Sequence, residues 1–231
     1  MILGFSSGCL FKTHDGMAGE TFDVFKKIGC NAIEIMCHDV ADIPKLAEIS
    51  LEDLRGFEHI SLHAPIFKDI SAEELEKMLR HIETAHKIIG FAYVVVHPDK
   101  ITDWKIFSDF SIPFAIENMD NRKETCRNVA DLKKVFEQVD MKMVLDVNHC
   151  FSNDPTMKLA GEFVEAFRER IVGIHLSGFE TFHDPLYKTQ QREIMDAVFD
   201  KNLPIIIESG CQSVDDVEKE YEYIKNNLIN I

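Results

Sequence analysis

The sequence lacks the features that mark several large classes of protein. None of its six cysteines forms a Cys-x-x-Cys pair, so neither a zinc ribbon nor a thioredoxin-like motif is present. No apolar stretch approaches the roughly 18 residues of a membrane span. The N-terminus has no basic residues ahead of its first apolar run, which argues against a secretory signal. We therefore expect a cytoplasmic protein with reduced thiols and no membrane association.

Positive charge is also scarce. Lys and Arg number 25 against 40 Asp and Glu, and the formal net charge is −15. This balance opposes non-specific binding to nucleic acid.

No Gly-x-Gly-x-x-Gly follows the first apolar run, so a dinucleotide-binding fold has little support. The length of 231 residues and hydrophobic content of 45% predict a single domain over residues 1–231, with a sizeable core.

What the sequence does contain is a weak repeat of a short apolar run, a polar turn and a helical pattern. Eight such runs are rich in Val and Ile, as buried parallel strands should be. They occupy residues 2–5, 32–36, 60–63, 93–97, 114–117, 143–146, 172–175 and 204–208. Eight strands alternating with helices predict an α/β fold, a single (β/α)8 TIM barrel, with an open doubly wound sheet as the alternative.

The helical patterns between these runs carry recognisable start and stop signals. Ser71 and Glu74 form a capping box ahead of a long helix that stops at Gly90. A helix over 21–28 ends at Gly29, which suits a left-handed C-terminal position. The remaining predicted helices cover residues 129–139, 157–169, 190–202 and 213–226, with only a short helix after His97.

Six successive runs end in an imidazole or a carboxylate. These residues are His63, His97, Glu117, Asp146, His175 and Glu208. A single polar strand end is usually an ordinary surface or core group, but six in register would face one another at the C-terminal rim, where TIM barrels place their active sites. Crowded carboxylates repel one another, and a divalent cation removes that cost. Mixed imidazole and carboxylate ligands fit Zn²⁺ or Mn²⁺.

Further ligand-type residues lie just beyond the rim. His149 follows Asp146 by three positions, and His183 lies in the loop after the seventh run. The resulting eight potential ligands exceed what one ion needs, so two or three ions are expected. Clustered ions suit hydrolysis at phosphorus, because they polarise the phosphoryl oxygen and activate water. Glu34 shares a strand face with Met36 and is predicted to point inward beside a ligand.

At these residues the sequence resembles the xylose isomerase-like TIM-barrel superfamily, also called AP endonuclease family 2. The matching segments are Leu62-His63-Ala64-Pro65, Val96-His97-Pro98, Ile116-Glu117-Asn118, Leu145-Asp146-Val147-Asn148-His149, His175-Leu176-Ser177-Gly178 and Ile207-Glu208. Each segment is weak alone, but their order and strand context carry the resemblance over nearly the whole chain.

The resemblance to endonuclease IV enzymes implies three zinc sites. The first would use His63, His97 and Glu117, and the second would use Glu117, Asp146, His175 and Glu208. His149 and His183 would hold the third ion. The family has an Asp two residues before that last histidine, whereas this chain has Thr181, so the third site is incomplete unless Asp184 substitutes.

The resemblance to the sugar isomerases and epimerases of the superfamily implies a different chemistry. Those enzymes would correspond at Glu117, Asp146, His175 and Glu208, with one manganese or similar ion. They typically carry a second Glu and an Arg where this chain has Lys123 and Thr181. They also generally lack counterparts of His63 and His97. The ligand set therefore favours the endonuclease-like branch.

The loops favour a small substrate over DNA. The steps between strand ends are short, with only 20 residues separating His97 from Glu117. Phosphate contacts to DNA need Lys or Arg, and base stacking needs exposed aromatic rings. Neither residue type forms a cluster along the sequence. We therefore expect a small phosphorylated or sugar-like substrate; nothing in the sequence indicates an oligomeric state.

Three hypotheses follow for the activity. The first is a multinuclear zinc or manganese phosphoester hydrolase in which Glu117, Glu208 and His149 are the catalytic residues. The second is a sugar or sugar-phosphate isomerase or epimerase, in which Glu117 and Glu208 move a proton beside a single ion. The third is a non-catalytic metal-binding barrel, which the fold alone does not exclude.

Overall fold

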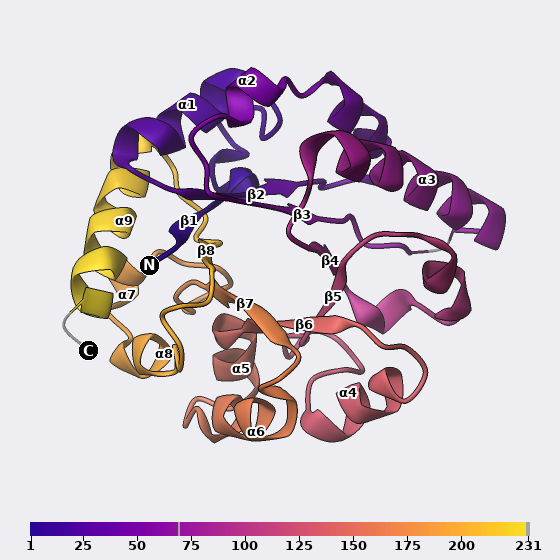
Figure 1. Cartoon of the computed structure of the whole chain (residues 1–231). Coiled ribbons are helices and arrows are strands. Elements are labelled where there is room, and N and C mark those ends of the chain that lie inside the picture. The colour runs from indigo at the N-terminus through magenta and orange to yellow at the C-terminus, as the bar shows by residue number, and fades with distance from the viewer. Residues whose placement is uncertain (69, 230–231) are drawn as a thin grey trace.

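The Val- and Ile-rich runs form the eight strands of a closed parallel barrel. The computed structural model describes residues 1–68 and 70–229, and its strands pair in sequence order until β8 closes onto β1 (Figure 1). The strands are β1 (Leu3–Ser6), β2 (Ala32–Met36), β3 (His59–His63), β4 (Val94–Val96), β5 (Phe114–Glu117), β6 (Lys142–Asp146), β7 (Ile171–Leu176) and β8 (Ile205–Ile207). The predicted (β/α)8 barrel is confirmed. His97 and Glu208 directly follow β4 and β8 instead of ending them.

The helices lie outside this ring of strands (Figure 1). They are α1 (Gly19–Ile28), α2 (Leu51–Leu54), α3 (Ala72–Ile89), α4 (Val129–Phe136), α5 (Val147–Asn153), α6 (Lys158–Phe167), α7 (Leu186–Thr189), α8 (Arg192–Asp196) and α9 (Val214–Ile229). Short 3-10 helices are η1 (Ser7–Leu10), η2 (Val40–Glu48), η3 (Pro98–Lys100) and η4 (Lys105–Asp109). The Ser71–Glu74 capping box and the left-handed Gly29 and Gly90 are present as predicted.

Several helical segments differ from the sequence prediction. The continuous helix predicted over 190–202 is wrong: only α8 forms there, and the side chain of Asp200 instead accepts the backbone N–H of Asn202 in a turn. A helix that was not predicted, α5, begins directly after β6. Asp146 caps it by accepting the backbone N–H of His149 at 2.7 Å. That cap places His149 beside the end of β6.

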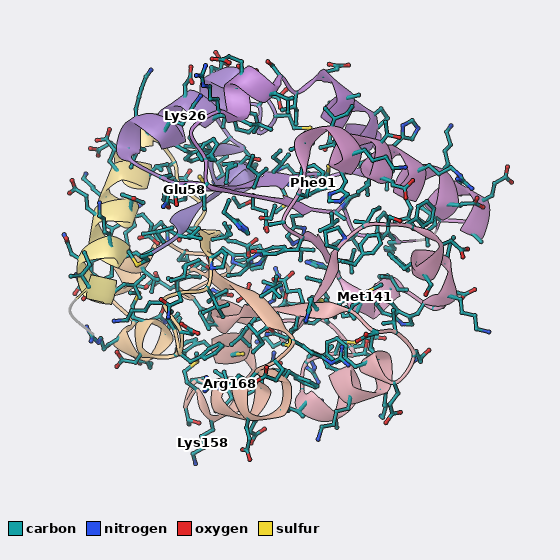
Figure 2. The ribbon with its side chains drawn as sticks, viewed as in Figure 1. Lys26, Glu58, Phe91, Met141, Lys158 and Arg168 are labelled. Atoms are coloured by element: carbon teal, nitrogen blue, oxygen red, sulfur yellow. The ribbon has the colours of Figure 1, made fainter. Side chains whose placement is uncertain are left out.

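The barrel centre below the strand ends is narrow and closely packed. Val95, Ala115 and Val144 precede His97, Glu117 and Asp146 by two positions, so they face inward one layer deeper, and with Tyr93 they form a separate buried cluster. A side chain at Gly173 would collide with Tyr93, so this glycine makes room for the aromatic ring. The filled centre closes the barrel beneath the strand ends, and side chains also fill the layer between strands and helices (Figure 2).

Phe5 provides a test of that outer layer. Its ring stacks on Phe25 with centroids 5.5 Å apart and contacts Tyr221, which ties β1 to α1 and α9. We expect Phe5→Ala to lower the free energy of unfolding by about 3–5 kcal/mol, because a fully buried ring leaves a cavity. Urea unfolding followed by circular dichroism measures the change. Phe11→Ala, at a ring that is 57% exposed, is the matched control, and an equal loss there would contradict the prediction.

None of the helices in the described residues is long and apolar enough to cross a membrane.

Candidate metal centre

All eight predicted ligands come together at the C-terminal ends of the strands. They form three overlapping groups, and in each group one nitrogen or oxygen atom per residue lies within 4.8 Å of the others. The groups are His63, His97 and Glu117; then Glu117, Asp146, His175 and Glu208; and finally Asp146, His149 and His183. The first two groups share Glu117 and the last two share Asp146. The predicted residues therefore form one connected cluster.

Glu117 lies at the centre of this cluster. Its Oε2 is 2.9 Å from Nε2 of His97 and 3.3 Å from Nε2 of His63, while its Oε1 is 3.0 Å from Nδ1 of His175. The two oxygens thus face different groups. The side chain is fully buried because it ends β5 and points into the barrel. This geometry suits a carboxylate that bridges two ions.

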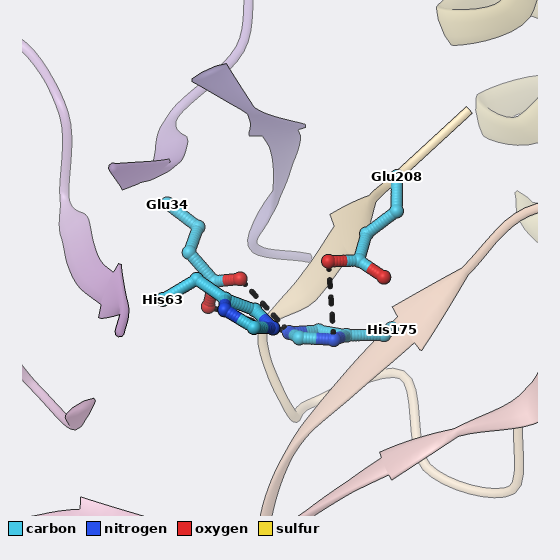
Figure 3. A group of neighbouring side chains, drawn as sticks. All are labelled: Glu34, His63, His175 and Glu208. Atoms are coloured by element: carbon cyan, nitrogen blue, oxygen red, sulfur yellow. Dashed lines mark hydrogen bonds and ion pairs between the residues drawn. The ribbon is translucent and has the colours of Figure 1, made fainter. Parts of the chain in front are cut away.

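His175 is held from both sides of its ring. Nδ1 lies 3.4 Å from Oε1 of Glu208, and Nε2 lies 3.1 Å from Oε1 of Glu34, so the imidazole sits between two carboxylates (Figure 3). Ser61, the register partner of Glu34 on β3, donates its hydroxyl to Oε2 of Glu34 at 2.9 Å. The predicted inward position of Glu34 is confirmed. Glu34 also groups with His63, His175 and Glu208.

The third group is the one whose carboxylate was in doubt from the sequence. Asp184 does not fill this role, because its carboxylate accepts the backbone N–H groups of Glu180, Thr181 and Phe182 in its own loop. Asp146 is instead the carboxylate that groups with His149 and His183. His149 Nδ1 donates to the carbonyl of Asn118 at 2.8 Å, and Nε2 lies 3.5 Å from Asp146 Oδ2.

Burial and mutual charge shift the pKa values of these groups strongly. Burial lowers the pKa of His183 to about 4 and also lowers the pKa of His97, so both rings are neutral near pH 7. Burial alone would lower the pKa of His63, but Glu117 outweighs it and raises that pKa to about 9. Burial raises the pKa of Asp146 well above its usual range, and the negative charge of Glu117 adds to that shift.

The donor set fits divalent cations. Among the described residues, no hydrogen-bond partner engages Oδ2 of Asp146 or Nδ1 of His97, although both atoms are buried. Buried carboxylate oxygens without partners are costly, and a cation offsets that cost. Imidazole nitrogens with carboxylate oxygens are typical ligands of Zn²⁺ and are accepted by Mn²⁺.

A cavity of about 470 Å³ opens above the cluster. Its wall includes Lys12 from the loop after β1, and Arg122 and Lys123 from the loop after β5. Phe11 and Phe182, which are 57% and 40% exposed, also line it. The sequence interpretation that found no basic or aromatic cluster is therefore wrong. Segments far apart in the chain bring these residues to one cavity.

Asp120 and Arg122 were missed by the sequence interpretation. Asp120 is only 3% exposed, and its Oδ2 is 3.8 Å from Nε2 of His149. In the sequence it belongs to the polar stretch 120–123, which has the composition of a solvated loop. The only available signal was its position three residues after Glu117, because burial depends on how the β5 loop folds back over α5.

Comparisons with known proteins identify similar structures without a close sequence relative. No protein-family model and no curated protein sequence matches the chain. Endonuclease IV from Thermus thermophilus aligns over 100% of both chains, with a TM-score of 0.70 and 14% identity. D-allulose 3-epimerase from Methylomonas sp. covers 99% of this chain and 98% of its own, with a TM-score of 0.68 and 15% identity.

A third similar structure, 3-keto-D-glucoside 4-epimerase from E. coli, covers 98% of this chain and 99% of its own, with a TM-score of 0.66 and 11% identity. All three proteins carry the names of enzymes, from the same two classes that the strand-end motifs resemble. At these identities the likeness establishes the fold and leaves the activity open. The chain has the (β/α)8 TIM-barrel fold of these structures, as its sequence implied.

Proposed function

We propose that this chain is a multinuclear metal-dependent hydrolase of small phosphate esters. The observation that carries the proposal is the group of His63, His97 and Glu117, which adds two imidazoles to the four-residue group around Asp146. A single ion in the four-residue group would leave those two histidines without a ligand role. Two adjacent groups joined through Glu117 would hold a pair of ions, which would supply charge stabilisation for a displacement at phosphorus.

The protein residues would have distinct roles in such a reaction. Divalent ions, when bound, polarise the phosphoryl oxygen and make water a better nucleophile. Glu117 would bridge the first two groups, and Glu208 would complete the second group at the cavity wall. His149 presents Nε2 toward Asp146 and lines the cavity, where it can exchange a proton with the ester oxygen that leaves. Water cleaves the P–O bond, yielding an alcohol and phosphate.

The dimensions and rim of the cavity favour a small organic ester over DNA. A volume of about 470 Å³ is in the range of small-molecule sites. Phe11, Ile66 and Phe182 are exposed apolar side chains, and all three line this cavity. They offer an apolar surface to the organic part of the substrate, while the net charge of −15 opposes association with a polyanion.

Metal content tests the proposal directly. We expect plasma mass spectrometry to find two or more zinc or manganese ions per chain in protein purified without chelator. His97→Ala should lower the count by one, because it removes a ligand of the first group only. Glu58→Gln, at an exposed residue that precedes β3, should keep the full count (Figure 2). One ion in the unaltered chain would contradict a multinuclear centre.

The geometry also favours a second candidate, a sugar isomerase or epimerase. Glu117 and Glu208 both contact Nδ1 of His175, at 3.0 and 3.4 Å. The two carboxylates therefore lie on the same side of the His175 ring. Such a pair can remove a proton beside a carbonyl and return it. Incubation with ketoses and ketose phosphates in deuterated water discriminates the candidates. Deuterium incorporation without phosphate release supports isomerisation, whereas phosphate release without incorporation supports hydrolysis.

A further inference from the structure

The guanidinium of Arg122 is held rigidly at the wall of the cavity. Its Nε donates to Oδ1 of Asp120 at 3.0 Å, and its Nη2 donates to Oδ2 at 2.6 Å, which is a two-point ion pair. The backbone N–H of Arg122 also donates to Oδ1 of Asp120 at 2.7 Å. A surface arginine normally samples many rotamers, but these contacts fix the plane of this one.

An aromatic ring supports the same guanidinium from another side. The central carbon of Arg122 lies 3.6 Å from the centroid of the Phe182 ring, close enough for a cation–π contact. Phe182 in turn packs edge-on against His183, with centroids 4.0 Å apart. Because Arg122 follows β5 and Phe182 follows β7, the contact spans the loops above the third ligand group. The guanidinium is therefore linked through Asp120 to His149 and through Phe182 to His183.

Arg122 still has hydrogen-bond donors to offer. Among the described residues, no partner engages Nη1, and the side chain is 51% exposed while lining the cavity. The other two cations of the cavity are less free: Lys123 lies 3.4 Å from the buried carboxylate of Asp99, and Lys12 donates to Gln212. Arg122 is thus the cation whose orientation is fixed and whose free N–H groups remain beside the ligands.

From this arrangement we infer that Arg122 binds the phosphate group of the substrate and sets the specificity of the site for phosphorylated compounds. The inference rests on the proposed function and names the residue that recognises its substrate. A planar guanidinium with fixed N–H groups matches two phosphate oxygens, and its preorganisation reduces the entropy lost on binding. Asp120 and Phe182 are then positioning residues, because they act through Arg122.

Binding of inorganic phosphate to the metal-loaded full-length chain tests the inference. We expect Arg122→Gln to weaken phosphate binding in titration calorimetry by about 10- to 100-fold, which corresponds to losing a charge-assisted hydrogen bond. The phosphate affinity of Arg122→Lys should lie between those of the unaltered chain and Arg122→Gln. The lysine ammonium keeps the positive charge but lacks the planar pair of N–H donors. Phe182→Leu should weaken binding by only about threefold, through a looser guanidinium. The metal content should stay unchanged in all three variants.

Arg127→Gln is the matched control, because it removes the same charge from the same loop at a residue outside the cavity wall. Phosphate affinity in this variant should equal that of the unaltered chain. Equal affinity in Arg122→Gln, with full metal content, would overturn the role of Arg122 and leave the proposed function intact. Loss of metal ions from Arg122→Gln would also overturn the role of Arg122 in phosphate binding, because it would show that Arg122 stabilises the metal-binding residues. An unaltered, metal-loaded chain that neither binds phosphate nor hydrolyses phosphate esters would overturn both proposals.

Discussion

Glu117→Gln is expected to abolish turnover and to lower the metal content from two or more ions to one or none. The amide keeps the size of the side chain but removes the charge that two ligand groups share. Because Oε2 faces His63 and His97 while Oε1 faces His175, one substitution weakens both groups together. We expect phosphate-ester hydrolysis to fall on the order of 1000-fold or more, as when a preorganised electrostatic contact to the reacting group is lost.

The measurement is turnover of a panel of phosphate monoesters and diesters, paired with metal analysis of the same samples. Glu58→Gln is the control, because it makes the same chemical change at an exposed position. Circular dichroism should show both variants folded, since the rest of the barrel is unchanged. If Glu117→Gln turned over substrate as fast as the unaltered chain, Glu117 would have no role in the metal centre, and the proposed mechanism would be contradicted.

Glu34→Gln is expected to weaken the binding of one ion by about 10- to 100-fold through the contact between Glu34 and His175. The carboxylate of Glu34 lies 3.1 Å from Nε2 of His175 and favours the proton on that nitrogen. Nδ1, which faces Glu117 and Glu208, would then be the nitrogen that offers its lone pair to the ion. The amide of the variant accepts a hydrogen bond less strongly, so the imidazole becomes a poorer ligand.

Competition against a chromophoric chelator measures the affinity of each ion, and ¹⁵N NMR of the imidazole rings reports which nitrogen of His175 carries the proton. Ser61→Ala should have a smaller effect in the same direction, because it removes only the hydrogen bond that orients Glu34. Unchanged affinity and an unchanged NMR pattern in Glu34→Gln would show that the contact is only a packing feature of the barrel centre.

Much of the architecture could be predicted from the sequence alone. The eight Val- and Ile-rich runs predicted the barrel because buried parallel strands have a composition that few other elements share. The helix predicted over 190–202 was wrong because the turn at Asp200 depends on a side chain competing for backbone donors. The helix after β6 was missed because its N-cap, Asp146, was interpreted only as a ligand.

The residue types at the strand ends and their order could be predicted from the sequence, and their meeting at one rim follows from the parallel barrel. How those residues pair with one another depends on the folded loops. In the folded chain, Asp184 binds the backbone of its own loop, and Asp146 groups with His149 and His183. Arg122 contacts Phe182, which lies 60 positions later in the sequence. The physical reason is that the contacts of loop side chains depend on the conformation of the loops. The periodicity of the strands does not predict that conformation.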